Sequence, residues 1–566
     1  MSASLRRRAV AQGRRLAHAA ARMACARAGR AFERALRDVR GAQTGRLRAV
    51  LRAVAGTAQA RRLGLEPAMT PEAFRERVPE SSYAALAAAI DRQRAGARGE
   101  LTVEACARYQ PTSGSRDAIK WIPYTRQFLA ELDAAISPWG FDLYRRFPGI
   151  AGGRHYWSLS WMPSNLRAAT AANVNDDRAL LSWPKRIFSA VTAPVPPWVA
   201  TTATSDDSLF ATLCFLAAAD DLTLISVWSP TFALGLFERL VSERAAMVEV
   251  LEEGRWDGQH RHLPGRAPRS PRAARILRAW DGQVDGAFLG ELWPRLALCS
   301  AWDTSTSARW ARQLARLTPG ARFQGKGLWA TEGVVTIPYG DRYPLAVRSH
   351  FYEFVDLDDG RPRFAWQLRD GQIVRPLLTT GGGLLRYALK DRLAVRGFLG
   401  DTPCFEFLDR IDDVDMVGEK MSPEAARAAL DALAAGAAAD GDASGAGADV
   451  CRPLSLLAVT PARAAEKPGY VALCEGPGAG AARDDRRAGL LDDSLRAAFH
   501  YNLARDLGQL APARVLTVAD ARRLYQQLGE ARGMVAGNIK PEALLLCDDA
   551  RSAALIRARI GERISS

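Results

Sequence analysis

Residues 101–125, LTVEACARYQPTSGSRDAIKWIPYT, contain the pattern that decides the fold. The run Leu101–Tyr109 is typical of a β-strand, and it leads into a turn of small hydroxyl residues around Gly114. Similar β-like runs occur at Leu222–Trp228 and Val334–Tyr339, with helical patterns between them. Alternation of short strands with helices between residues 100 and 400 predicts an α/β domain.

Helix starts are predicted on either side of this region. Thr70 followed by Pro71 is typical of a helix start, with a capping hydroxyl and proline in the first turn. Ser422–Pro423 repeats this pattern, and we expect its alanine-rich helix to end near Gly436. A chain of 566 residues exceeds what one hydrophobic core organises, so we expect a second, smaller domain.

The positive charge of the chain is concentrated at its beginning. Residues 1–62 contain 16 arginines and two acids, so they carry +14 of the net +15. This pattern indicates a basic arm and does not indicate a basic cleft. For residues 1–30 we favour a solvated helix over contact with nucleic acid or an anionic membrane.

The composition also indicates in which cellular compartment the protein is expected. The longest apolar run, Leu209–Ala219, is too short to cross a bilayer, and no secretory signal begins the sequence. The eight cysteines occur singly, which is typical of reduced thiols. We therefore expect a cytoplasmic protein with no obligate protein partner.

The turn after the first β-like run is a candidate phosphate loop. Backbone N–H groups and hydroxyls can bind a polyphosphate there, Gly114 permits close approach, and Lys120 adds charge. The GxxxxGK spacing of a P-loop is absent, and serine–glycine loops are also common without phosphate. The candidate ligands are Thr112, Ser113, Gly114, Ser115 and Lys120.

Two carboxylates downstream are candidates for the same site. Glu332, preceded by Thr331, precedes a β-like run, and its hard oxygen suits Mg²⁺. Asp391 lies between two apolar runs, where a carboxylate can accept both hydroxyls of a ribose. The alternatives are a solvated surface glutamate and a turn aspartate.

Lysine is rare in this chain, with seven among 77 basic residues. Because arginine is used elsewhere, a retained lysine marks a place where a compact charge is preferred to a planar fork. Lys120, Lys420 and Lys540 fall in candidate motifs, whereas Lys185, Lys326 and Lys467 receive no role from this pattern.

Five motifs in this order resemble the auxin-responsive acyl acid–amido synthetases, from about residue 40 to residue 548. They are residues 111–125, 327–340, 381–410, 418–420 and 537–540. That family conjugates plant hormones to amino acids and belongs to the adenylate-forming superfamily. The resemblance implies a large N-terminal α/β adenylate-forming domain, residues 31–409, and a smaller mobile α+β C-terminal domain, residues 410–566. Residues 1–30 form the preceding arm.

The resemblance also implies a role for each matching residue. Ser113, Gly114 and Ser115 match the phosphate loop, and Thr331 and Glu332 match the motif at the α-phosphate, with Glu332 as the metal ligand. Tyr352 lies in the segment near the adenine, Asp391 matches the ribose ligand, and Arg410 lies near the hinge. Lys540 matches the adenylating lysine, and Lys420 faces the same site. Arg116, Asp117 and Lys390 depart from the family pattern.

The function implied is an ATP- and Mg²⁺-dependent ligase that adenylates a carboxylic acid. It would transfer the acyl group to an amine, an amino acid by the resemblance, and release AMP and pyrophosphate. One alternative is transfer to a thiol such as coenzyme A. Another is a non-catalytic nucleotide-site protein, against which the retention of Glu332, Asp391 and Lys540 argues. Trp157, Trp161 and Trp329 lie near motifs, either in the core or around an aromatic acid.

Overall fold

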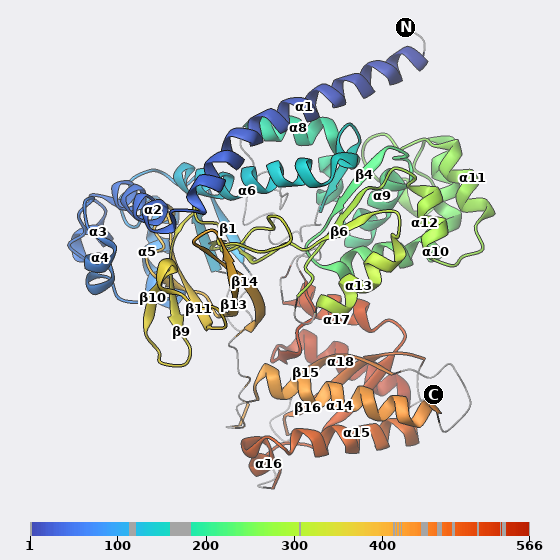
Figure 1. Cartoon of the computed structure of the whole chain (residues 1–566). Helices are drawn as coiled ribbons and strands as arrows, with labels where there is room; N and C mark the ends of the chain where they lie inside the picture. The colour runs from blue at the N-terminus through green and yellow to red at the C-terminus, as the bar shows by residue number, and fades with distance from the viewer. Residues whose placement is uncertain are drawn as a thin grey trace. The chain divides into compact units, whose positions relative to one another are not determined.

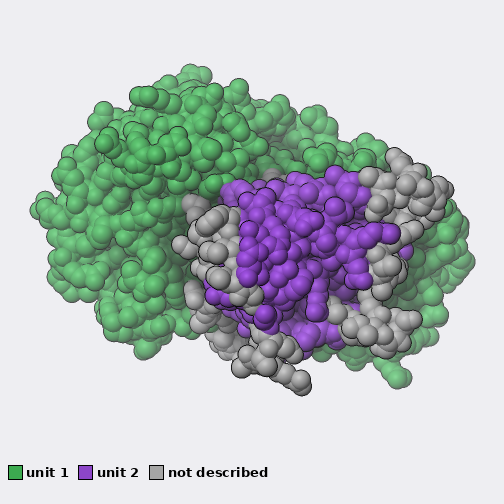
Figure 2. All heavy atoms as spheres, turned by 90° about the horizontal axis from the view of Figure 1, so that it is seen from below, with its two compact units in different colours: residues 1–112, 119–408 green, residues 113–118, 409–566 purple. Residues whose placement is uncertain are grey.

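The computed structural model divides into two compact units, residues 1–112 with 119–408 and residues 409–566, which Figure 2 colours separately. The residues it describes are 3–112, 120–158, 183–304, 307–410, 414, 416–417, 419, 421–442, 451–460, 467–477, 481–506, 509–532, 534 and 539–564. Ser113, Gly114, Ser115, Trp161 and Lys420 lie outside the described residues. Among the described residues, every helix is too short or too polar to cross a lipid bilayer.

The first unit begins with five helices. Pro71 occupies the first turn of its helix and the Thr70 hydroxyl accepts a hydrogen bond from Ala73 N, as predicted for this start. The long first helix packs along α6 and α8 (Figure 1). The five helices are α1 (Ala3–Ala35), α2 (Val39–Val54), α3 (Ala58–Arg62), α4 (Pro71–Arg77) and α5 (Tyr83–Arg94), and α6 (Arg126–Arg146) and α8 (Trp183–Thr192) come later in the chain.

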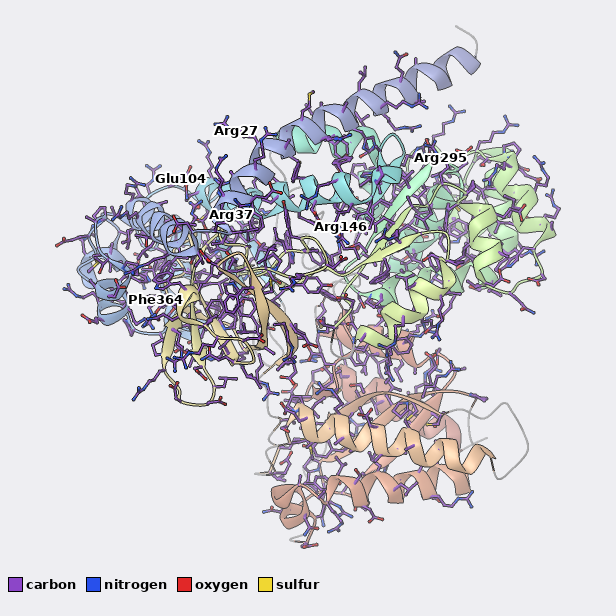
Figure 3. The ribbon with its side chains drawn as sticks, viewed as in Figure 1. Arg27, Arg37, Glu104, Arg146, Arg295 and Phe364 are labelled. Atoms are coloured by element: carbon purple, nitrogen blue, oxygen red, sulfur yellow. The ribbon has the colours of Figure 1, made fainter. Side chains whose placement is uncertain are left out.

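The basic N-terminal segment is not solvated on all sides. His18 is buried, with Nδ1 2.8 Å from the Tyr144 hydroxyl and Nε2 2.9 Å from the Gly153 carbonyl oxygen. Arg14 is also buried and forms an ion pair with Asp221. Arg27 lies on the exposed side of α1 (Figure 3). The expectation of a solvated helix is therefore wrong for one face of α1, and residue 30 falls inside this helix.

A four-stranded parallel sheet with helices forms one part of the first unit. Its strand order is β3-β4-β5-β6, and α6 lies against one face, where Trp139 Nε1 donates to Gln324 Oε1. Every residue of β4 is buried, as an apolar strand covered on both faces should be. The strands are β3 (Arg154–Trp157), β4 (Leu222–Ser226), β5 (Leu298–Ser300) and β6 (Arg322–Gln324). The helices between them are α9 (Ser205–Ala217), α10 (Pro230–Glu253), α11 (Pro271–Ala279), α12 (Gly286–Leu292) and α13 (Ala308–Leu317).

The first unit also contains a larger, six-stranded sheet. Its strand order is β10-β9-β11-β13-β14, and β12 pairs with β11. Two short antiparallel pairs, β1–β2 and β7–β8, accompany it. The strands are β1 (Arg108–Thr112), β2 (Lys120–Tyr124), β7 (Trp329–Ala330), β8 (Gly333–Val334), β9 (Phe351–Asp356), β10 (Pro362–Phe364), β11 (Ile373–Thr379), β12 (Tyr387–Ala388), β13 (Asp391–Leu399) and β14 (Thr402–Arg410).

Two of the predicted strands are displaced or shortened. The run from Leu101 becomes a strand only at Arg108, because Leu101 N donates to the Gln93 side chain of α5 and not to a strand partner. Of the predicted run Val334–Tyr339, only Val334 belongs to a strand, because β8 ends there. The residues after Val334 form only isolated bridges, Thr336 with Leu345 and Tyr339 with Arg342.

The second unit is an α+β layer. Its sheet has the order β17-β16-β15-β18. The two central strands, β15 and β16, are antiparallel, and each outer strand runs parallel to its own neighbour. The helix expected to end near Gly436 continues to Asp442, because alanines follow the glycine. The strands are β15 (Arg452–Val459), β16 (Gly469–Glu475), β17 (Arg514–Val518) and β18 (Leu544–Cys547). The helices are α14 (Pro423–Asp442), α15 (Ala481–Leu495), α16 (Phe499–Asp506), α17 (Ala521–Ala531) and α18 (Ala550–Ile564). The predicted fold class, a large α/β part followed by a smaller α+β part, is confirmed.

Candidate active site

Thr331 and Glu332 form the turn between β7 and β8. The Tyr124 hydroxyl, at the end of β2, donates a hydrogen bond of 2.9 Å to the Thr331 carbonyl oxygen. The Tyr387 hydroxyl, on β12, donates to Glu332 Oε1 at 3.4 Å. The structure therefore brings the Thr331–Glu332 motif together with the strand that follows the candidate phosphate loop.

A buried hydrogen bond between a carboxylate and a histidine supports this turn. Glu131 on α6 and His350 are both fully buried, and His350 Nδ1 lies 2.8 Å from Glu131 Oε2. Val334 N donates to His350 Nε2, so the imidazole carries its proton on Nδ1 and donates it to the carboxylate. Gly381 N also donates to both oxygens of Glu131. The pair joins α6, β8 and the glycine segment after β11.

Tyr352 is fully buried behind the same turn. Its hydroxyl donates to the Val334 carbonyl oxygen at 2.5 Å, and its amide donates to Gln43 Oε1 at 2.8 Å. Burial raises the pKa of the Tyr352 phenol well above its usual value. Gln43 in turn donates to the carbonyl oxygens of Val347 and His350. These bonds hold the backbone around the Thr331–Glu332 turn.

The candidate phosphate loop lies between two paired strand ends. Thr112 is the last residue of β1 and is directly opposite Lys120, the first residue of β2. Lys120 Nζ is 5.9 Å from the centroid of the Tyr83 ring, and the Tyr83 hydroxyl accepts a hydrogen bond from Trp121 N. The loop residues between these ends are outside the described part of the chain.

The remaining predicted residues are distributed over both units. Asp391 is the first residue of β13 and is 7% exposed, whereas Lys390 before it is exposed. Arg410 ends β14, directly after the boundary between the units at Asp409. Lys540 belongs to the second unit, where its carbonyl oxygen accepts a hydrogen bond from the buried Tyr525 hydroxyl of α17.

The side chains near Glu332 indicate which kind of metal ion could bind there. Among the described residues, no group of three or more histidine, cysteine, aspartate or glutamate side chains is arranged to hold one. Glu332 is a single, partly exposed carboxylate at a turn. This arrangement fits Mg²⁺, which proteins bind through one or two carboxylates while substrate phosphates and water supply the other ligands.

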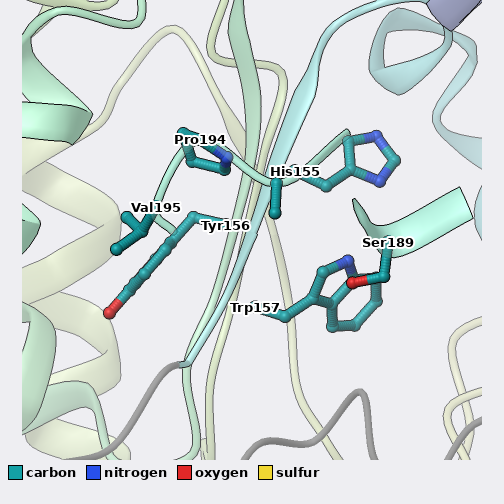
Figure 4. Close-up of a pocket in the computed structure, with 7 residues that line it drawn as sticks. His155, Tyr156, Trp157, Ser189, Pro194 and Val195 are labelled. Carbon is teal, nitrogen blue, oxygen red and sulfur yellow. The ribbon is translucent and has the colours of Figure 1, made fainter. Parts of the chain in front are cut away.

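A small recess lies beside β3, where Trp157 and its neighbours meet α8 (Figure 4). His155 is buried there, its Nε2 donates to the Ile150 carbonyl oxygen, and burial lowers the pKa of its imidazole to about 3. Trp157 and Trp329 both pack against Trp139 of α6, with ring centroids 5.7 Å apart in each pair. The recess is lined by His155, Tyr156, Trp157, Ser189, Ala193, Pro194 and Val195.

Sequence reasoning missed Glu131, His350 and Gln43 as parts of the candidate site. A charged residue at an apolar helical position, between Phe128 and Leu132, is the signal by which Glu131 was recognisable. His350 lies 219 residues further along the chain, and no local pattern relates the two.

Comparisons with known proteins identify the family of this chain. The GH3 family N-terminal domain matches residues 28–323, and the GH3 family central domain matches residues 343–410. Two solved structures resemble the chain, "AtGH3.15 acyl acid amido synthetase in complex with 2,4-DB" and "GH3.15 acyl acid amido synthetase". The first has a TM-score of 0.75 at 18% identity and covers 95% of this chain and 96% of its own. The second has a TM-score of 0.72 at 16% identity and covers 93% of this chain and 94% of its own. No curated protein sequence matches the chain. Because the N-terminal family domain alone spans more than half of its residues, the chain belongs to the GH3 family.

Proposed function

We propose that this protein is an ATP-dependent ligase that converts a carboxylic acid to an acyl-adenylate and transfers the acyl group to the amino group of an amino acid. The observation that carries the proposal is the position of the Thr331–Glu332 turn, held by Tyr124 against the β1–β2 hairpin in a chain of the GH3 family. The similar solved structure named as an acyl acid amido synthetase in complex with 2,4-DB supports an acid substrate and an amide product.

The first half-reaction is an attack of one anion on another. A carboxylate oxygen of the acid forms a bond to the α-phosphorus of ATP, and the bond to the pyrophosphate leaving group breaks. Ser113, Gly114, Ser115 and Lys120 would bind the phosphates, and Asp391 would bind the ribose hydroxyls. Lys540 would neutralise the developing charge, because a positioned cation stabilises the transition state more than the separated anions.

Glu332 would hold Mg²⁺, which supplies charge neutralisation at the phosphate oxygens. In the second half-reaction the amine nitrogen attacks the acyl carbonyl carbon, the amine loses a proton, and AMP leaves. Thr331 lies at the same turn, where its hydroxyl would contact the α-phosphate.

We assign Tyr352 to the support of the turn and not to contact with the adenine. Its complete burial and its hydrogen bond to Val334 support this assignment. Arg410 and Lys420 remain proposed contributors near the junction of the units. Small-molecule substrates are consistent with a cytoplasmic enzyme.

The test is a competition between acceptors. ATP–pyrophosphate exchange over a panel of carboxylic acids identifies an acid that is adenylated. That acid is then incubated with ATP, a mixture of amino acids and coenzyme A, and the products are separated by mass spectrometry. We expect an acyl–amino acid amide together with AMP. Formation of the acyl-coenzyme A thioester instead would show that the acceptor is a thiol.

A further inference from the structure

One face of α1 is packed against the rest of the first unit. Arg14, His18 and Phe32 are buried on this face, and the helix packs along α6 and α8. A detached helix loses conformational freedom when it binds a surface, whereas a helix that already packs on its own protein loses little more. The docked helix therefore presents its opposite face in a fixed orientation on the first unit.

The opposite face of α1 is a row of exposed side chains, which we call the outer stripe. It consists of Leu16, Ala20, Met23, Arg27, Arg30 and Arg34, all of which are exposed. These residues follow one another at alternating steps of four and three, which places them on one side of the helix over roughly 27 Å. Figure 1 shows α1 along the outer edge of the first unit. Leu16 is 65% exposed and Met23 is 71% exposed, so two large apolar side chains and three guanidinium groups face the solvent together.

The positive charge of the outer stripe is not balanced by acids of the same helix. Residues 1–32 contain no acidic residue. The first acid, Glu33, is turned towards the protein, where it accepts hydrogen bonds from the Tyr339 hydroxyl and from Arg145 Nη1. Within the part of the chain that the structure describes, the arginines of the outer stripe form no ion pair. This face therefore attracts partners that carry phosphate groups.

Nucleic acids and anionic bilayers both have phosphates at their surface, and the apolar residues of the stripe distinguish between them. Leu16 and Met23 gain from leaving water, and only a bilayer has an apolar region directly beneath its phosphates. The guanidinium groups can remain among the headgroups while the arginine stems cover apolar surface. Proteins that bind single-stranded nucleic acids stack the bases on aromatic side chains, and the outer stripe contains no aromatic residue. The stripe therefore fits a bilayer better than a nucleic acid.

We propose that the outer stripe of α1 is a contact surface for an anionic lipid bilayer, at which the protein binds peripherally and reversibly. Each arginine near an anionic surface strengthens binding about fivefold, so the three together strengthen it about 10²-fold. Salt screens this attraction, whereas the contribution of Leu16 and Met23 does not depend on charge. The contact does not depend on the proposed ligase activity, because no residue of the outer stripe belongs to the candidate active site.

The experiment measures co-sedimentation of the full-length protein with lipid vesicles. Vesicles of phosphatidylcholine alone are compared with vesicles in which about one third of the lipid is phosphatidylglycerol, which makes the surface anionic. We expect binding to the anionic vesicles to be at least about tenfold tighter at physiological salt, and to weaken as the salt concentration is raised.

The triple variant Arg27→Gln, Arg30→Gln, Arg34→Gln tests the charge of the stripe. It should bind the anionic vesicles about 10²-fold more weakly. Glutamine has a helix propensity close to that of arginine, and circular dichroism checks that the variant is folded. The salt dependence of the unmodified protein tests the same attraction if the variant does not fold.

The matched control removes the same charge from another surface of the first unit. Arg261→Gln, Arg266→Gln, Arg275→Gln changes three exposed arginines outside the stripe and should bind like the unmodified protein. The double variant Leu16→Gln, Met23→Gln retains the charge and should weaken vesicle binding by about tenfold, at high salt as well as low.

Three results with vesicles would overturn the inference: equal binding to neutral and anionic vesicles, no binding to either, or unchanged binding of the folded triple variant. A fourth comparison uses duplex DNA and single-stranded RNA at the same salt concentration. If either nucleic acid binds more tightly than the anionic vesicles and the triple variant loses this binding, the stripe is a nucleic-acid surface and the bilayer assignment is wrong.

Discussion

The side chain of Lys540 is the residue on which the proposed adenylation chemistry depends most. Lys540→Ala should lower ATP–pyrophosphate exchange by about 10²-fold, because one positioned charge contributes roughly 2.7 kcal/mol to such a transition state. ATP binding, measured by calorimetry, should be largely retained, since the charge develops only during the reaction. Lys467→Ala is the matched control at an exposed position. Unchanged exchange in the Lys540 variant would remove this residue from the reaction.

Glu332 is tested by an isosteric change. Glu332→Gln retains an oxygen that can accept the Tyr387 hydrogen bond but removes the negative charge. A neutral amide is a weaker ligand for a hard cation, so the Mg²⁺ concentration for half-maximal exchange should rise and turnover should fall. Titration of Mg²⁺ at saturating ATP measures both quantities. A variant with the wild-type Mg²⁺ dependence would contradict the assignment.

His155 makes stability depend on pH. Burial lowers the pKa of this imidazole from 6.5 to about 3, so below pH 6.5 the unfolded chain binds a proton that the folded chain does not. Stability is therefore lost as the pH falls from 6.5 towards 3, by roughly 2 kcal/mol at about pH 5. Burial also lowers the pKa of His18, whose ring centroid is 4.7 Å away, and this acts in the same direction.

Urea unfolding followed by tryptophan fluorescence at about pH 7.5 and about pH 5 measures this dependence, because the denaturant midpoint reports stability. The variant His155→Gln should lose roughly 2 kcal/mol less than the wild type between these two conditions. An identical loss in both proteins would show that His155 does not determine the acid sensitivity.

At the scale of elements, the packing of α1 on α6 depends on close approach. A Cβ added at Gly29 would overlap the Phe141 ring, whereas nothing lies within 4 Å of a Cβ added at Gly13. Gly29→Ala should therefore destabilise the first unit by about 1–3 kcal/mol. Gly13→Ala should be neutral or stabilising by about 0.5–1 kcal/mol, because alanine favours the helix.

Thermal unfolding of the two variants provides the comparison. Similar melting temperatures for Gly29→Ala and Gly13→Ala would mean that α1 does not pack on α6 in solution. In that case residues 1–30 would be the detached arm that their composition suggests.

Local patterns predicted those elements whose hydrogen bonds are local. The start of α4 was predictable because Thr70 and Pro71 satisfy the first helical turn by themselves. The start of β1 was not, because the backbone before it bonds to the side chain of Gln93. The end of α14 was misplaced because a single glycine among alanines does not stop a helix.

In the candidate site, too, some features follow from local sequence and others depend on contacts between distant segments. The position of Thr331 and Glu332 directly before a strand was predictable from their motif, whereas their hydrogen-bonded neighbours Tyr124 and Tyr387 are placed by tertiary structure. The Glu131–His350 pair joins segments 219 residues apart, so it depends on the packing of α6 against the strands. Lys326 directly precedes the motif of residues 327–340 and receives no role from it, and the tryptophans around it come from α6, β3 and the segment after β4.

At the scale of the whole molecule, the proposed chemistry requires residues of both units. Glu332 and Asp391 belong to the first unit, and Lys540 belongs to the second. Rotation of the smaller domain about residues near 410–420 would allow one pocket to serve adenylation and then transfer, as lids and domains do in many enzymes. On this proposal Lys540→Ala should impair adenylation but allow transfer from a supplied acyl-adenylate to the amine.

The most direct test of the central claim follows an oxygen atom. The acid identified by exchange is labelled with ¹⁸O in its carboxylate and incubated with the enzyme, ATP and the amino acid acceptor. An acyl-adenylate intermediate requires that one carboxylate oxygen bonds to the α-phosphorus and leaves with it. Mass spectrometry should therefore find one ¹⁸O in AMP and none in pyrophosphate. Label in inorganic phosphate, with ADP as the nucleotide product, would contradict adenylation.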